Sequence, residues 1–168
     1  MVKPNNLRKV SIARLKQEMQ DTVFLSDDLA ITTIDYLRNP TSEIPVSLDG
    51  FAAMIMMSGS AVLSIDTETY EVRPNMLVFF RPGSIIRTIR CSSDATAYLV
   101  ACSKAFVSDI QVDISASLPI HMRFGRKPCL QVTERDVAEI RQFFQLIKTV
   151  IQSDKERYRK EIIHTLFT

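Results

Sequence analysis

Histidine, cysteine and tryptophan are scarce in this chain. Its 168 residues include two histidines, three cysteines and no tryptophan. Two histidines leave few ways to build a transition-metal site, so we expect no metal ligands. The three cysteines are far apart and form no Cys-x-x-Cys pair, which favours neither a zinc ribbon nor a disulfide scaffold. A reducing, cytoplasmic location is therefore the expectation.

Long apolar runs and the common catalytic motifs are missing as well. No run of 18 apolar residues occurs, which predicts that no helix spans a membrane. The polar start at Met1–Asn6 has no apolar core of the kind that signal peptides carry. The chain lacks G-x-S-x-G, H-E-x-x-H, Walker and G-x-G-x-x-G motifs. We therefore expect no enzyme, no catalytic residue and no cofactor.

A strong excess of either charge is also absent. The chain has 21 Lys and Arg against 19 Asp and Glu, a formal net charge of +2. This balance excludes a polybasic nucleic-acid module. His121 and Cys129 lie close enough in sequence to be considered as a base and a thiol nucleophile. A loop histidine beside a buried thiol is the better interpretation.

Glycine and proline divide the chain into two parts. They recur through the first 128 residues and are missing from 129 to 168. Short apolar, β-branched segments between these breakers predict an all-β sandwich or barrel. The predicted strands are 30–37, 51–57, 61–65, 70–72, 76–80, 84–90 and 95–102, with a hairpin tip at 66–69.

The breaker-free last part predicts helices. Thr133 and Asp136 form a capping box that begins a helix, and Ser153 or Asp154 caps a second helix from Lys155 onward. A shorter helix is expected near 104–110. One face of the first long helix carries an apolar stripe, formed by Val137, Ile140, Phe144, Ile147 and Ile151. This stripe either packs on the β domain or pairs with a second chain, and we predict a homodimer contact.

The strand-rich part contains candidates for binding a small ligand. Arginines can clamp a carboxylate or phosphate, and methionines can line an adaptable cavity. Arginines at a barrel rim and methionines in a core are the ordinary alternatives. Strand parity and side-chain chemistry select the candidate ligand-binding residues, which are Arg38, Met56, Phe80, Arg87 and Tyr98. A register error of one residue would move any of them to the opposite face.

The order of parts resembles the N-terminal regulatory domain of AraC-family bacterial transcription regulators, in its cupin-like version. The resemblance runs through the segments 49–61, 70–83, 103–106 and 158–163. It implies a mainly β fold with C-terminal α, namely a cupin-like jelly-roll barrel followed by a helical hairpin. It divides the chain into an N-terminal arm (1–20), a barrel (21–103) and a helical dimerisation segment (104–168).

The resemblance also implies a function. The barrel would bind a small-molecule effector, the helices would form a homodimer, and DNA would be bound only by a helix-turn-helix half beyond these residues. The uncapped apolar end at Thr168 leads us to expect a longer natural protein. The strands that carry histidines in metal-binding cupins contain none here, so metal chemistry is not expected. A stand-alone metal-free cupin-like enzyme of the isomerase type, or a simple small-molecule binding protein, is the alternative.

Overall fold

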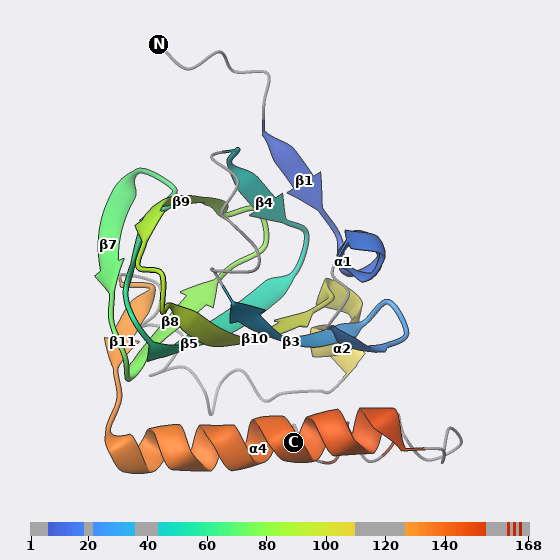
Figure 1. Cartoon of the computed structure of the whole chain (residues 1–168). Coiled ribbons are helices and arrows are strands. Elements are labelled where there is room, and N and C mark those ends of the chain that lie inside the picture. Colours follow the sequence, from blue (N-terminus) through green and yellow to red (C-terminus); the bar gives the residue numbers. More distant parts are fainter. Residues whose placement is uncertain are drawn as a thin grey trace.

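Two packed β-sheets and one long helix make up the domain (Figure 1). The computed structural model describes residues 7–18, 22–35, 44–109 and 127–153, with Glu161, Ile163 and Thr165. The predicted class, mainly β with a C-terminal helix, is confirmed. The strands form two separate sheets of a sandwich, so the predicted barrel is not closed by hydrogen bonds across the described residues.

The chain passes repeatedly from one sheet to the other along the sequence, although some consecutive strands lie in the same sheet. Across the five-stranded sheet the order is β1 (Arg8–Val10), β4 (Val46–Leu48), β9 (Ile85–Cys91), β6 (Ala61–Ile65) and β7 (Glu68–Val72). Across the six-stranded sheet it is β11 (Cys129–Gln131), β8 (Met76–Phe80), β5 (Phe51–Ser58), β10 (Thr96–Cys102), β3 (Leu29–Asp35) and β2 (Val23–Leu25). Every described pair of neighbours is antiparallel except β1 and β4, which are parallel.

Turn chemistry fixes the hairpins where the sequence predicts them. Asp66 begins the turn between β6 and β7 with a φ of 55°. Gly59 follows β5 with a φ of +66°, and a Cβ there would lie 2.6 Å from the Ala95 Cα atom. Only glycine meets both constraints at that position.

Two apolar clusters hold the layers together. The first fills the space between the sheets and includes Met54, Met56, Leu63, Val78 and Phe80. The second lies on the outer face of the six-stranded sheet, where helix α4 (Glu134–Gln152) packs. Figure 1 shows α4 running along that face.

The second cluster contains a stacked aromatic pair. The rings of Tyr98 on β10 and Phe144 on α4 have centroids 4.3 Å apart and planes 11° apart. Phe144, Ile147 and Ile151 are buried here together with Ile163, which is helical. Glu161 and Thr165 are helical as well, and the other residues of the predicted second helix lie outside the described part of the chain.

The predicted N-terminal arm forms regular secondary structure between residues 8 and 18. Residues 8–10 form β1, and helix α1 (Ile12–Glu18) follows directly. Val10 and Ile12 are each only 2% exposed and belong to the cluster between the sheets. Residues 8–18 of the predicted arm therefore pack on the β domain. The short helix predicted near 104–110 is confirmed as α2 (Lys104–Asp109).

The capping box of α4 is confirmed and gives a pH-dependent prediction. Thr133 donates from its backbone N–H and its hydroxyl to Asp136 Oδ2, at 2.9 and 2.7 Å. These bonds lower the pKa of Asp136 below its usual 3.8. A depressed pKa in the folded state adds stability above the unfolded pKa, and that stability is lost as the pH falls through the folded value.

Asp136→Asn is accordingly expected to flatten the acid limb of the stability profile. Urea unfolding of the wild type and the variant, measured between about pH 5 and pH 2, tests this. Glu134→Gln is the matched control, because it removes a charge from the same turn and leaves both capping bonds in place. Equal acid sensitivity of Asp136→Asn and the wild type would contradict the prediction.

Candidate ligand-binding site

Apolar side chains fill the space between the two sheets. Met56 is fully buried and Phe80 is 5% exposed, both from the predicted ligand set. Among the described residues the only buried polar side chains are Thr32, Ser47 and Ser84, and none of them is charged. A molecule held between the sheets would therefore be bound mainly by apolar contacts.

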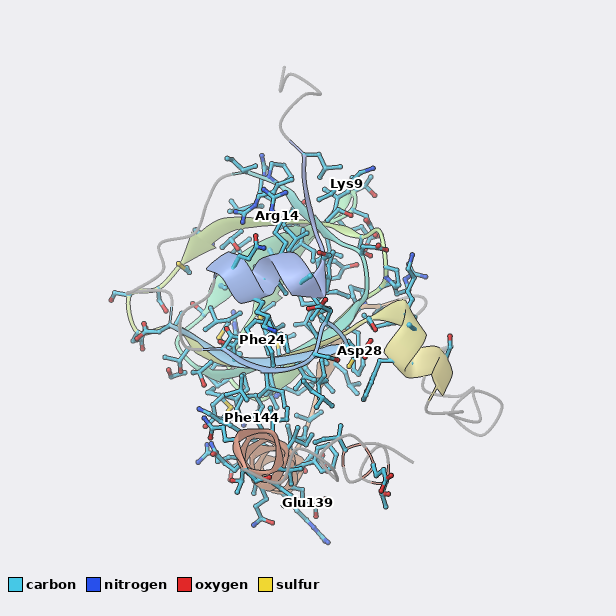
Figure 2. The ribbon with its side chains drawn as sticks, turned by 90° about the vertical axis from the view of Figure 1, so that its right-hand side faces the viewer. Lys9, Arg14, Phe24, Asp28, Glu139 and Phe144 are labelled. Carbon is cyan, nitrogen blue, oxygen red and sulfur yellow. The ribbon has the colours of Figure 1, made fainter. Side chains whose placement is uncertain are left out.

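Helix α1 lies across one side of this interior. Figure 2 shows it between the two sheets, with Arg14 turned outward. Ile12 and Leu15 pack against the interior cluster, while Arg14 and Lys16 are exposed. Ser11 caps the helix by accepting a hydrogen bond from the Arg14 N–H at 3.2 Å. The helix therefore covers the interior as a short amphipathic lid.

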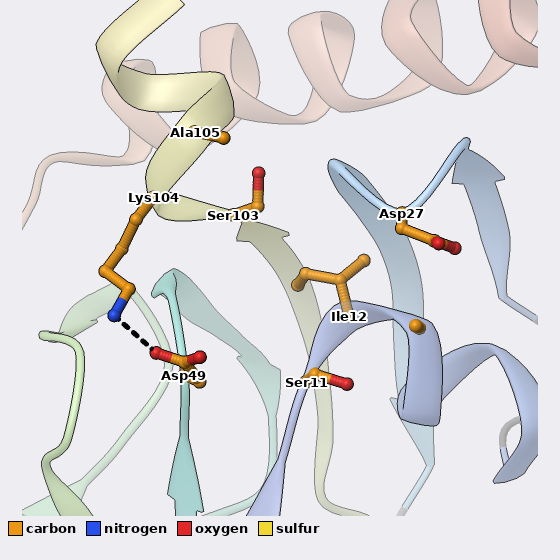
Figure 3. A pocket seen from close by; sticks show the side chains of 8 residues that line it. Ser11, Ile12, Asp27, Asp49, Ser103, Lys104 and Ala105 are labelled. Atoms are coloured by element: carbon orange, nitrogen blue, oxygen red, sulfur yellow. Dashed lines mark ion pairs between the residues drawn. The ribbon is translucent and has the colours of Figure 1, made fainter.

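A cleft of about 280 Å³ separates the start of α1 from the start of α2 (Figure 3). Its lining residues come from four segments and are Ser11, Ile12, Ala13, Asp27, Asp49, Ser103, Lys104 and Ala105. Lys104 Nζ and Asp49 Oδ1 lie 2.7 Å apart across it, and both side chains are more than half exposed. A pair this exposed contributes little stability. The ion pair links the turn between β4 and β5 to the start of α2.

Beside this cleft, hydrogen bonds hold the start of α2 more firmly than the exposed ion pair does. The Ser103 hydroxyl donates to Asp28 Oδ1 at 2.8 Å and accepts from the Phe106 N–H at 3.0 Å. The Ser103 N–H donates to the Asp28 carbonyl at 2.7 Å. These bonds fix α2 to the β2–β3 turn.

Two other predicted ligand residues face away from the interior. Tyr98 stacks on Phe144 beneath α4, on the outer face of the six-stranded sheet. Arg87 pairs in register with Ser64, whose neighbours Leu63 and Ile65 point inward, so Arg87 lies on the outer face of the other sheet. The prediction that Tyr98 and Arg87 face the interior is therefore wrong, because a register difference of one residue places a side chain on the opposite face of its strand. Arg38 lies outside the described residues.

The apolar stripe on α4, which is predicted to form a dimer contact, packs instead on the chain's own six-stranded sheet. Phe144, Ile147 and Ile151 are at most 3% exposed, and Val137 is 7% exposed. Ile140 is half-buried. The four buried residues are therefore not free for another chain. The exposed apolar residues of α4 are instead Phe143 and Leu146, at 38% and 47%.

Sequence reasoning missed α1 as part of the site. Ile12 and Leu15 are three residues apart, a helical spacing, and Ser11 is a good N-cap residue. Charged residues surround these positions, so the short helical pattern is hard to recognise in the sequence.

Burial keeps two thiols, including that of the candidate nucleophile Cys129, in their neutral form. Burial, with a smaller contribution from Asp28, raises the pKa of Cys102 to about 12. Burial raises the pKa of Cys129 to about 11. A protonated thiol is a poor nucleophile at neutral pH. His121, the possible partner of Cys129, lies outside the described residues.

Within the described ranges, no three His, Cys, Asp or Glu side chains gather where they would hold a metal ion. His164, like His121, falls outside those ranges. None of the helices in the described part of the chain is long and apolar enough to cross a membrane.

The sequence matches a known family over most of its length. The model of the AraC-like ligand binding domain matches residues 42–167. The chain belongs to this family. No curated protein sequence matches it. The described part of this AraC-like domain thus joins the matched β-sandwich to an N-terminal lid, α1, that precedes the matched residues.

Solved structures with similar folds include ToxT and cupin proteins. ToxT from Vibrio cholerae strain SCE256 is 11% identical with a TM-score of 0.49, over 83% of this chain and 53% of that one. A cupin superfamily protein from Desulfitobacterium hafniense is 11% identical with a TM-score of 0.38, over 49% and 74%. Oxalate decarboxylase from Bacillus subtilis is 19% identical with a TM-score of 0.38, over 58% and 25%. The chain therefore spans about half the length of the ToxT chain it matches.

Proposed function

We propose that this domain senses a small-molecule effector for an AraC-family transcription regulator and brings two copies together. It performs no catalysis itself, and DNA is contacted by a separate helix-turn-helix part. The observation that carries the proposal is the family match over residues 42–167, on a sandwich whose interior is covered by α1. The division into arm (1–20), β domain (21–103) and helical segment (104–168) forms part of this proposal.

The effector is largely apolar in this proposal. The interior beneath α1 contains Met54, Met56 and Phe80, and no charged residue among the described ones is buried. Methionine side chains adapt easily to a guest molecule. A ligand shifts the position of α1 only by binding more tightly to one arrangement than to the other. Such a shift has to offset the loss of the contacts that Ile12 and Leu15 make with the interior.

A thermal-shift screen of the purified domain tests effector binding. The panel contains small aromatic acids, medium-chain fatty acids and sugars. We expect stabilising hits among the apolar compounds, because the interior offers them the better contacts. A ligand at 100 times its dissociation constant adds about 2.7 kcal/mol. A panel in which only sugars stabilise the domain would contradict an apolar effector, and no hit of any kind would contradict sensing.

The dimer is formed by the exposed edge of α4 in this proposal. Phe143 and Leu146 are three residues apart, so they lie on one side of the helix. Half-buried Val150 continues this edge four residues on. An apolar edge next to a buried stripe is typical of an interface between copies.

Leu146→Asp is expected to convert a dimer to a monomer in sedimentation equilibrium. The charge would be desolvated at the interface, while the monomer keeps its core. Gln145→Asp, an exposed position on the same helix that points away from the Phe143–Leu146 edge, is the matched control and should leave the dimer unchanged. A wild-type domain that stays monomeric at high concentration would contradict the dimer.

A further inference from the structure

A second cleft lies at the end of the sandwich where three turns meet. Its volume is about 460 Å³, within the range of small-ligand sites. Its lining residues are Phe51, Asp66, Arg81, Pro82, Gly83 and Ser84. None of them belongs to the apolar cluster between the sheets. This cleft is therefore separate from the interior that the proposed effector occupies.

Hydrogen bonds fix the turns that form the cleft. The Gly83 N–H donates to the Leu48 carbonyl at 3.0 Å, and the Asp66 N–H donates to the Ile85 carbonyl at 2.7 Å. The Ile85 N–H donates to Asp66 Oδ1 at 2.9 Å. The carboxylate of Asp66 is therefore oriented, and its Oδ2 atom remains for another donor.

Two further polar groups in the cleft have unused hydrogen-bonding capacity. Ser84 is only 8% exposed, and its hydroxyl makes no hydrogen bond with the residues that the structure describes. The Ser84 hydroxyl is not among the described buried side-chain atoms that lack a partner, so it is reachable from the cleft and can donate to or accept from a ligand. Arg81 is exposed and forms no ion pair within the described ranges. Its guanidinium has five N–H donors for a planar anion.

We propose that this cleft binds a small polyhydroxylated anion, either a sugar acid or a sugar phosphate. Arg81 binds the anionic group through paired hydrogen bonds. Asp66 accepts hydrogen bonds from the ligand hydroxyls. The Ser84 hydroxyl pairs with a further hydroxyl of the ligand. The cation of Arg81 and the carboxylate of Asp66 line the same cleft and thus select a ligand that carries both an anion and hydroxyl groups.

Calorimetric titration of the domain with four probes tests this site. The probes are gluconate, glucose 6-phosphate, glucose and acetate. We expect saturable binding of gluconate, glucose 6-phosphate or both, with amide shifts of Asp66 and Gly83 in NMR spectra. A response to one of these two identifies the anionic group, a carboxylate or a phosphate. Glucose lacks the anion and acetate lacks the hydroxyls, so both should bind at least tenfold more weakly.

Variants assign the binding to named groups. Arg81→Gln should weaken it at least tenfold, and Ser84→Ala should weaken it several-fold. Arg90→Gln is the matched control, because Arg90 is exposed on β9 and does not line the cleft. The proposal is overturned if neither anionic sugar binds, if glucose or acetate binds equally well, or if Arg81→Gln binds like the wild type. Because the cleft lies outside the interior, these outcomes leave the effector screen unaffected.

Discussion

Ile12→Ala is expected to lower the free energy of unfolding by about 2–5 kcal/mol. Ile12 is 2% exposed and packs between the two sheets from the N-terminal lid. Its removal leaves a cavity that the surrounding strands fill only in part. Because the same change loosens α1, binding of an apolar fluorescent dye to the folded variant should also rise. Urea unfolding and dye titration measure the two effects.

Lys16→Ala is the control for this prediction. Lys16 lies on the same helix, and its side chain is exposed. The substitution should leave the free energy of unfolding within about 0.5 kcal/mol of the wild type. If Ile12→Ala behaved like Lys16→Ala, α1 would not be part of the folded core.

Phe144→Ala is expected to cost about 3–5 kcal/mol of stability. Phe144 is 3% exposed and stacks on Tyr98 across the boundary between α4 and the six-stranded sheet. Its removal takes away both the buried apolar area and the ring contact. We expect α4 to lose hydrogen-exchange protection along with global stability.

The neighbouring Phe143 offers a matched comparison. Its side chain is 38% exposed, so Phe143→Ala should cost much less stability in the monomer. It should weaken the α4 dimer instead. Circular dichroism melting at a low protein concentration separates the two effects. A larger loss for Phe143→Ala than for Phe144→Ala would reverse the assignment of the buried face.

Much of the fold follows from local sequence signals. Thr133 and Asp136 predict the start of α4 because a capping box needs no tertiary information. The hairpin at Asp66 and the turn after Pro82 are likewise local. The strands β5 to β10 follow from apolar segments between such breakers. Their assembly into a mainly β sandwich rests on spacing and on the resemblance to a known family.

The candidate site was harder to predict, because strand parity decides it. Met56 and Phe80 lie between the sheets as expected. Tyr98 and Arg87 do not, since a one-residue difference places a side chain on the other face. Both faces of the six-stranded sheet are apolar, as α4 covers the outer one. Alternation in hydrophobicity, the usual guide to the buried face, is therefore lost.

The roles of the N-terminal lid and of α4 depend on tertiary packing. Ile12 lies among polar residues, and only the gap between the sheets gives it a partner. The stripe around Ile147 has the same pattern whether it covers a sheet or a second chain. The structure places it on the chain's own sheet.

Hydrogen–deuterium exchange of α1 is the measurement that tests the central claim most directly. The domain is compared with and without a stabilising apolar compound, and the amides of residues 12–18 are followed. If α1 is a lid over the bound effector, binding changes the amide exchange of α1 more than that of β6 or β7, which lie farther from α1. Binding that stabilises the domain but leaves α1 exchange unchanged would contradict it.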